Sequence, residues 1–267
     1  MPLAVCATPI GNLEDVTLRV LRELRQADLV LCEDTRRTRV LLNRHGIGAS
    51  VTSYHEHNEA ERTAEVLPRL QAGARVALVT DAGLPAISDP GARLVAAALE
   101  AGVPVTVLPG PSAVETALVA SGFAAERYQF LGYLPRGVAS LDALWAELAR
   151  WPWAVVAFES PRRLPATLRS LAAALPDRDL AVCRELTKQF EEVVRGPAPE
   201  VASRFSQPPK GEITIVVAGG EPSPPDLAEA SRAVAELVAA GSGRRAAAEV
   251  VARLTGVARN TLYRGSL

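Results

Sequence analysis

The chain has 267 residues, of which 48% are hydrophobic, and its formal net charge is −1. At roughly 100–200 residues per domain this length favours two domains, and the near-neutral charge excludes a protein whose whole surface attracts nucleic acid. Nearly all basic residues are arginine, whose planar fork suits phosphate, but genome composition explains this bias more simply. With neither a signal-peptide pattern nor a long apolar run, we expect a cytoplasmic protein without a membrane partner.

The cysteines and histidines do not favour a metal site. Cys6, Cys32 and Cys183 each lie within an apolar run, so we expect buried thiols in a reducing compartment. His55 and His57 have acidic neighbours, but no further Cys or His cluster follows them. We therefore favour a polar loop there and expect no metal.

Short apolar runs alternate with helical patterns from residue 1 to 112. The strands are expected at 3–8, 28–33, 51–54, 75–80 and 104–108, and the helices at 15–26, 36–45, 59–72 and 91–101. This alternation predicts an α/β domain with a doubly wound parallel sheet. Ligands of such sheets bind beyond the carboxyl ends of the strands, so the loops at 9–14, 34–38, 81–90 and 109–112 should share one rim.

Residues 113–220 have the pattern of a second α/β domain. Its strands are expected at 128–132, 153–158, 179–185, 190–195 and 212–218, and the close spacing of the last three suggests antiparallel pairing in a mixed sheet. A proline-rich stretch then leads into a helical tail at 226–267. There, Gly256 lies between two short helical patterns, as in a helix-turn-helix. This tail either binds nucleic acid or packs on its own domain.

The stretch "ATPIGNLEDVTLR" lies between a strand and a helix, where α/β proteins place a phosphate loop. Because the loop has a single glycine, Gly11, it is either a degenerate phosphate-binding loop or a loop that binds a ligand without phosphates. The next rim segment, "CEDTRRTRVLL", is either a ligand-binding group of charges or a helix start capped by Asp34 or Thr35.

Three further segments carry candidate site residues. In "TDAGLPAISDPG" we expect residues 81–88 to be functional, with Asp89 as helix cap and Pro90 in the first turn. In "LPGPSAVETAL", Ser112 is the expected cap of the next helix. The charges of "CRELTK" belong either to a site or to an ordinary sheet edge.

Together, "TPIGNLEDVTLR", "EDTRRT", "HEHNE", "DAGLPAISDPG", "LPGPSA", "FESPRRL" and "CRELTK" resemble, in this order and spacing, the ribosomal RNA small subunit methyltransferase I family. That family belongs to the tetrapyrrole methylase superfamily, and the resemblance spans residues 3–218 and extends to "GVARNTLY". It implies S-adenosyl-L-methionine-dependent 2′-O-methylation of a cytidine in the decoding region of 16S rRNA, within the small ribosomal subunit. It also implies two α/β domains with the cofactor between them, and a homodimer.

Residue roles follow from the matching motifs. The cofactor-binding positions implied are Pro9, Ile10, Gly11, Asp81, Gly83, Leu84, Pro85, Ile87, Gly110, Ser112, Ala113, Phe158, Glu159, Arg184, Glu185, Leu186 and Thr187. For activation of the ribose hydroxyl the candidates are Glu33, Asp34 and Asp81, with Glu159 behind them. RNA contacts are expected from Arg36, Arg37, Lys188, Arg244, Arg245, Arg259 and Asn260.

Three other functions can be distinguished from RNA methylation, each by a feature of its own. A methylase of a tetrapyrrole-type small molecule would have Gly-Asp-Pro at 83–85, where this chain has Leu84 in place of the aspartate. A non-catalytic RNA-binding module would not bind S-adenosylmethionine. A nucleotide-binding oxidoreductase needs Gly-x-Gly-x-x-Gly after a strand, and the sequence has none. Because S-adenosylmethionine carries a sulfonium and no phosphate, the glycine-poor first loop suits one wall of a methyl-donor cleft.

Overall fold

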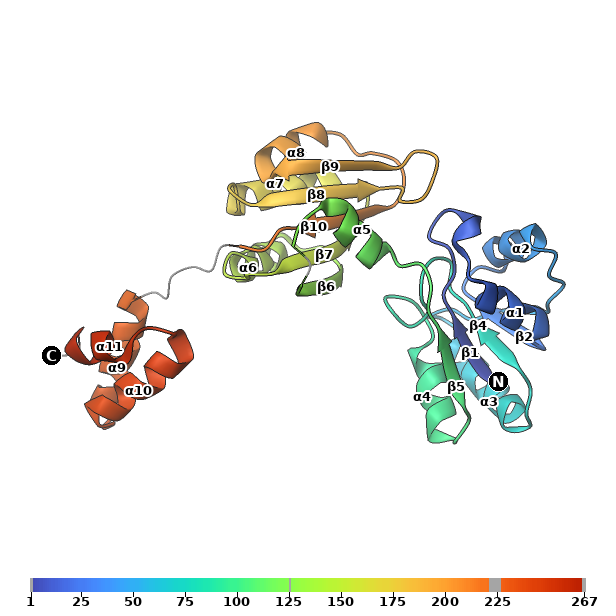
Figure 1. The fold of residues 1–267 in the computed structure, drawn as a ribbon, viewed down its shortest axis with the longest axis horizontal. Coiled ribbons are helices and arrows are strands. Elements are labelled where there is room, and N and C mark those ends of the chain that lie inside the picture. The colour runs from blue at the N-terminus through green and yellow to red at the C-terminus, as the bar shows by residue number, and fades with distance from the viewer. Residues whose placement is uncertain (1, 125, 221–226, 266–267) are drawn as a thin grey trace. The chain divides into compact units, whose positions relative to one another are not determined.

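The computed structural model describes residues 2–124, 126–220 and 227–265. Its N-terminal sheet consists of β1 (Leu3–Cys6), β2 (Leu29–Cys32), β3 (Val51–Ser53), β4 (Val76–Leu78) and β5 (Val105–Leu108). The strands are all parallel and lie in the order β3-β2-β4-β1-β5 (Figure 1). β1, β2 and β4 are buried along their whole length, as expected for strands covered on both faces.

Helices cover both faces of this sheet. α1 (Leu18–Gln26) and α2 (Thr35–Arg44) share a core with one face, whereas α3 (Glu59–Gln71) and α4 (Ala92–Glu100) share a core with the other. A short 3₁₀ turn at Leu13–Asp15 precedes α1. The predicted doubly wound parallel sheet is therefore confirmed.

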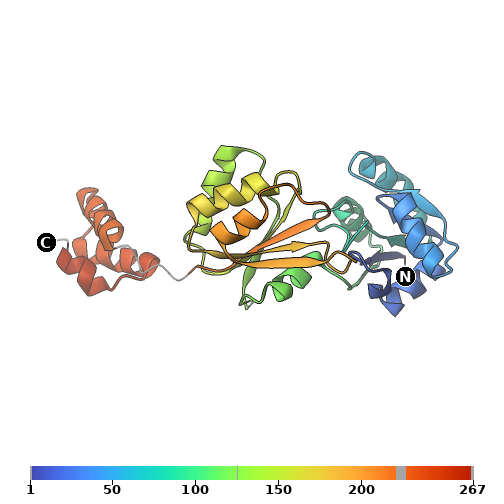
Figure 2. The ribbon, with the colours of Figure 1, turned by 90° about the horizontal axis from the view of Figure 1, so that it is seen from above.

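The second sheet is mixed, with the order β6-β7-β10-β8-β9. The strands are β6 (Tyr128–Tyr133), β7 (Ala154–Glu159), β8 (Asp179–Arg184), β9 (Glu192–Pro197) and β10 (Ile213–Val217). Only β6 and β7 pair in parallel, so the antiparallel arrangement expected for the last three strands is confirmed. α5 (Ala113–Ser121) covers one face, and α7 (Leu164–Ala174) and α8 (Ala198–Arg204) cover the other (Figure 2). α6 spans Val138–Leu148.

Both sheets belong to one compact unit, Met1–Ala146 and Trp153–Gly219. The second unit contains the helical tail, α9 (Leu227–Ala239), α10 (Arg244–Thr255) and α11 (Arg259–Gly265), which has a small apolar core of its own. Gly256 ends α10 in the left-handed conformation, with φ +75°, as the helix-turn-helix pattern predicts. Within the described ranges, no helix has the length and apolar character needed to cross a bilayer.

Local predictions at the helix starts had mixed outcomes. Of the two cap candidates for α2, Asp34 and Thr35, it is Asp34 that caps the helix, accepting the Arg36 N–H at 2.8 Å. The prediction that Asp89 caps the next helix is wrong, because α4 begins at Ala92 with Gly91 at the cap position. Gly91 has φ +138°, and a Cβ there would lie 2.9 Å from Leu78 Cδ2. Ser112 occupies the cap position of α5, but its hydroxyl bonds the Glu115 carboxylate rather than a backbone N–H. The three cysteines are buried, as expected.

Candidate active site

A cleft of about 480 Å³ lies between the two sheets of the larger unit, at the carboxyl ends of the N-terminal strands. The loops after β1, β2 and β4 contribute Ile10, Glu33 and Asp81. The opposite wall comes from the end of β7 and the start of β10, which are adjacent because these two strands are antiparallel. The cleft is thus at the rim where the parallel topology predicts a ligand.

Most of the cofactor residues expected from the sequence line this cleft. They are Ile10, Asp81, Gly83, Leu84, Ile87, Ser112, Ala113, Phe158, Glu159 and Leu186. Pro9 and Gly11 line an adjoining hollow of about 300 Å³, which shares Ile10, Arg37 and Asp81 with the cleft.

The remaining predicted cofactor residues line neither hollow. They are Pro85, Gly110, Arg184, Glu185 and Thr187. Gly110 lies against the residue that follows β1, since a Cβ on it would be 2.9 Å from that of Ala7. Arg184 pairs with Glu192 at 2.9 Å.

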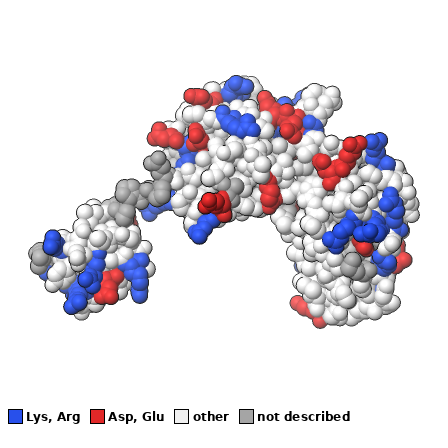
Figure 3. All heavy atoms as spheres, viewed as in Figure 1, with Lys and Arg blue, Asp and Glu red and all other residues white. Residues whose placement is uncertain are grey.

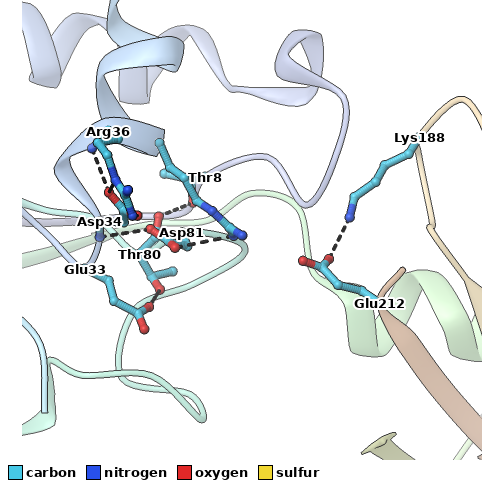
Figure 4. A network of polar contacts seen from close by, with 9 residues as sticks. Thr8, Glu33, Asp34, Arg36, Thr80, Asp81, Lys188 and Glu212 are labelled. Atoms are coloured by element: carbon cyan, nitrogen blue, oxygen red, sulfur yellow. Dashed lines mark hydrogen bonds and ion pairs between the residues drawn. The ribbon is translucent and has the colours of Figure 1, made fainter. Parts of the chain in front are cut away.

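The loop after β4 is fixed against the first loop by backbone pairing. The Thr8 N–H donates to the Gly83 carbonyl at 2.8 Å, and the Gly83 N–H donates back at 3.0 Å. The Thr8 hydroxyl donates to the Thr80 carbonyl at 2.9 Å (Figure 4). Further along, Ala86 and Ser88 have positive φ of 71° and 61°. Non-glycine residues adopt this conformation at a cost, and such positions cluster at ligand clamps.

The carboxylates near the loop ends differ in their hydrogen bonds and ion pairs. Asp34 accepts the Arg36 N–H and forms an ion pair with that guanidinium at 2.7 Å, which lowers the Asp34 pKa to about 2. Asp34 lines neither hollow. An ionised, fully engaged carboxylate is a poor proton acceptor at neutral pH, so its contacts favour a structural role.

Asp81 and Glu33 face the cleft (Figure 4). Asp81 accepts the Asp34 N–H at 3.1 Å and lies 3.4 Å from the Arg37 guanidinium. Glu33 accepts from the Thr80 hydroxyl at 3.4 Å. Burial raises the pKa of Glu33, and the nearby negative charge of Asp81 raises it further. Of these two acids, Glu33 is therefore the better proton acceptor.

Asp89 is a cleft residue that sequence reasoning missed. Burial, together with the charges of Glu33 and Asp81, raises the Asp89 pKa to about 6, although the Thr80 hydroxyl opposes the shift. The local Asp-Pro-Gly pattern predicted a helix cap and concealed this position. The available signal was a second acidic residue in the strand-end loop that already contained Asp81.

The second sheet contributes a buried polar cluster and an aromatic wall. Glu159 is 2% exposed and accepts from the Ser160 N–H at 2.6 Å, the Arg163 Nε at 2.7 Å and the Thr167 hydroxyl at 2.6 Å. Phe158 lies edge-on to Phe130 and Tyr133, with ring centroids 5.0 and 5.6 Å away. Phe158 and Tyr133 line the cleft and give it an aromatic side.

The first loop and the loop after β8 are in close contact. The Asn12 N–H donates to the Thr187 hydroxyl at 3.0 Å, and a Cβ on Gly11 would lie 2.8 Å from the Leu186 carbonyl oxygen. The Lys188 ammonium lies 2.9 Å from both the Glu185 and the Glu212 carboxylate, so both of these charges are partly neutralised (Figure 4 shows the Glu212 pair). Lys188 was expected to contact RNA, and here its charge is engaged within the protein.

The other residues expected at RNA are on helix starts. Arg36 and Arg37 lie in the exposed first turn of α2, and Arg37 also lines both hollows. In the tail unit, Arg244 and Arg245 begin α10, and Arg259 and Asn260 begin α11. In the part of the chain that the structure describes, no group of three or more His, Cys, Asp or Glu residues is arranged to hold a metal ion.

Comparison with known proteins connects this geometry to one family. The sequence profile of the tetrapyrrole (corrin/porphyrin) methylases matches residues 2–202. The chain is 43% identical to ribosomal RNA small subunit methyltransferase I of Mesorhizobium japonicum, over 98% of this chain and 90% of that protein. It is 46% identical to the protein of the same name from Thermotoga maritima, over 82% of this chain and 99% of that protein.

A solved structure supports the fold. Uroporphyrin-III C-methyltransferase from Thermus thermophilus, solved in complex with S-adenosyl homocysteine, superposes with a TM-score of 0.57 at 20% identity, covering 81% of this chain and 96% of that one. From the fold, the full-length identities and the profile match, the chain belongs to the tetrapyrrole methylase family and, within it, to the ribosomal RNA small subunit methyltransferase I group.

Proposed function

We propose that this protein is an S-adenosylmethionine-dependent methyltransferase that methylates the 2′-hydroxyl of a cytidine in 16S rRNA. The observation that carries the proposal is the charge of the cleft. Its described lining includes the acids Glu33, Asp81, Asp89, Glu159 and Glu212, with Arg37 as the one Lys or Arg. Asp81, Glu159 and Glu212 have basic partners, whereas among the described residues Glu33 and Asp89 form no ion pair. An acidic cleft suits a cationic sulfonium and disfavours a nucleotide phosphate.

The residues present fit this cofactor. The aromatic side formed by Phe158 and Tyr133 offers a surface for a flat base, and Gly83 and Ala82 let a ligand approach the main chain closely. The uroporphyrin-III C-methyltransferase of the same fold binds S-adenosyl homocysteine, the demethylated form of this donor. When bound, the donor supplies an electrophilic methyl group.

The protein's own residues would handle the proton of the attacking hydroxyl. Transfer of a methyl group requires the hydroxyl oxygen to be aligned with the methyl carbon, and a ribose hydroxyl attacks better as its proton leaves. Glu33 and Asp89 both interact with the Thr80 hydroxyl, and the pKa of each carboxyl is raised. A general base works best when its pKa is near the working pH, so these two are the preferred acceptors. Asp81, held by Arg37 and the Asp34 N–H, positions the loop.

The wider setting follows from the substrate. Relatives of similar sequence are named for action on small-subunit ribosomal RNA, so the proposed partner is 16S rRNA or the small ribosomal subunit and the proposed location is the cytoplasm. A homodimer is proposed from the family resemblance. The cofactor role of the lining residues and the RNA role of the tail arginines are part of the same proposal.

A second candidate is methylation of a tetrapyrrole-type small molecule, which the fold alone would allow. The chain has Gly83-Leu84-Pro85 where such enzymes are expected to have Gly-Asp-Pro, and this difference favours RNA. Calorimetry with S-adenosylmethionine comes first, because absence of binding would favour a non-catalytic RNA-binding protein. Incubation with tritiated donor and either 16S rRNA or uroporphyrinogen III then separates the two enzymes. Label in the tetrapyrrole and none in RNA would overturn the proposal.

A further inference from the structure

α1 and α2 together carry an unusual concentration of arginine. α1 has three arginines and one glutamate, and α2 has four arginines and no acidic residue. All seven arginines are exposed, and we call them the arginine face: Arg19, Arg22, Arg25, Arg36, Arg37, Arg39 and Arg44. We propose that the arginine face binds the phosphate backbone of the substrate RNA and leads the RNA to the cleft. This inference rests on the proposed function.

The arginines share a side of the protein because of how the two helices pack. Both helices cover the same face of the N-terminal sheet, with Val20, Leu21 and Leu24 of α1 and Leu41 and Leu42 of α2 in one core. Their outward sides are therefore on the same side of the sheet. Figure 3 shows Lys and Arg gathered over this part of the molecule. In a chain with net charge −1, such a gathering makes a local positive field that attracts polyanions.

Several of these guanidinium groups are available to a ligand. Among the described residues, Arg19, Arg22 and Arg39 have neither an ion pair nor a hydrogen bond through their side chains. Arg25 donates only to the His45 carbonyl, and Arg44 pairs with exposed Glu14 at 3.2 Å. Exposed pairs of this kind contribute roughly 0–1 kcal/mol, so a phosphate can replace them easily.

The arginine face is continuous with the proposed active site. Arg37 lines both the cleft and the adjoining hollow, and Thr38, Val40 and Leu41 of α2 also line that hollow. RNA held on α2 would therefore already be beside the carboxylates of the cleft. A second copy of this chain is a poorer occupant, because a symmetric interface would bring two arginine-rich faces together and like charges would repel.

The test is a triple variant, Arg19→Gln, Arg22→Gln and Arg39→Gln, which leaves the cleft untouched. The matched control is Arg69→Gln, Arg169→Gln and Arg204→Gln, three exposed arginines on α3, α7 and α8 that have no ion pair among the described residues. Filter binding of in vitro transcribed 16S rRNA is measured between about 50 and 200 mM salt. Calorimetry with S-adenosylmethionine and thermal unfolding show whether the fold and the donor site are intact.

Loss of three phosphate contacts should reduce the slope of log K against log salt by about 2 to 3, since each contact contributes roughly 0.7–0.9. We expect the control to keep the wild-type slope and both variants to keep donor affinity. If the test variant keeps the wild-type slope while the wild-type enzyme methylates rRNA, the arginine face does not bind the RNA backbone. The same conclusion follows if the test variant changes from dimer to monomer and keeps the wild-type slope. By contrast, a wild-type protein that neither binds the donor nor methylates RNA would overturn the proposed function itself.

Discussion

Gly11→Ala tests whether the contact between the first loop and the loop after β8 sets the geometry of the cleft. Gly11 does not have a positive φ, so alanine is compatible with its backbone and the effect arises from space alone. The new Cβ would lie 2.5 Å from Lys188 Cγ, 2.7 Å from Thr187 Oγ1 and 2.8 Å from the Leu186 carbonyl oxygen. The lysine stem can rotate away, whereas the carbonyl oxygen moves only with its backbone.

The size of the expected effect follows from these distances. Ordinary contact begins near 3.4 Å, so the Leu186 carbonyl must move by at least the difference of 0.6 Å. Overpacking of this kind costs about 1–3 kcal/mol, and misplacement of reacting groups by about 1 Å can reduce a rate by about 10²-fold. We expect donor affinity to fall by about 10-fold, which is about 1.4 kcal/mol, and methyl transfer to fall by about 10- to 100-fold.

Calorimetry measures the donor affinity, and tritium incorporation into RNA measures the rate. Gly48→Ala is the matched control, because Gly48 also lacks a positive φ and a Cβ added to it would have no neighbour within 4 Å. Wild-type affinity and rate in Gly11→Ala would show that this loop contact does not shape the donor site.

The further predictions concern the acids and the tail. If Asp89 accepts the proton, kcat/KM should rise with pH through about 6 and Asp89→Asn should lower kcat by about 10²–10⁴-fold; a full rate in the variant would remove Asp89 from the mechanism. The folded-state pKa of Asp89 lies above its unfolded value of 3.8, so the native state holds the extra proton and stability falls as pH rises from about 4 to 6. For the wild type we expect the free energy of unfolding to fall by on the order of 1–2 kcal/mol over this range, because Asp89 is only partly buried. Denaturant titrations of Asp89→Asn should lack most of this fall. Glu159→Ala should destabilise the fold by about 3–5 kcal/mol in urea titrations by leaving Arg163 without its buried partner, whereas exposed Glu200→Ala should change little; equal stabilities would contradict the buried network. Removal of residues 226–267 should weaken rRNA binding by about 10-fold or more through lost phosphate contacts and spare donor binding, and unchanged RNA affinity and activity would eliminate the tail's role.

The sheets could be predicted from the sequence because their signal is local. β1, β2 and β4 are short apolar runs bounded by turn residues, and a fully buried parallel strand requires little else. The cap of α2 was predictable for the same reason, since Asp34 bonds a backbone N–H only two residues away. The antiparallel pairing of β10 with β8 was predicted from the short distance in sequence between the last three strands.

Features that depend on distant residues were not predictable in this way. Asp89 has the sequence context of a helix cap, but its raised pKa depends partly on Glu33, which the end of β2 brings near, and it lines the same cleft as Glu33. Lys188 has the context of an exposed RNA contact, yet Glu212, 24 positions further along the chain, binds its ammonium. Neither the Asp89–Glu33 interaction nor the Lys188–Glu212 pair lies within one local pattern, whereas the Glu185–Lys188 pair, three residues apart, does.

Transfer of tritiated methyl groups from S-adenosylmethionine to small ribosomal subunits, followed by mapping of the labelled nucleotide, tests the central claim most directly. We expect label on the 2′-oxygen of one cytidine of 16S rRNA, and no label with a variant in which Glu33 and Asp89 are both replaced by their amides. Absence of label in RNA from a wild-type protein that binds the donor would contradict this expectation.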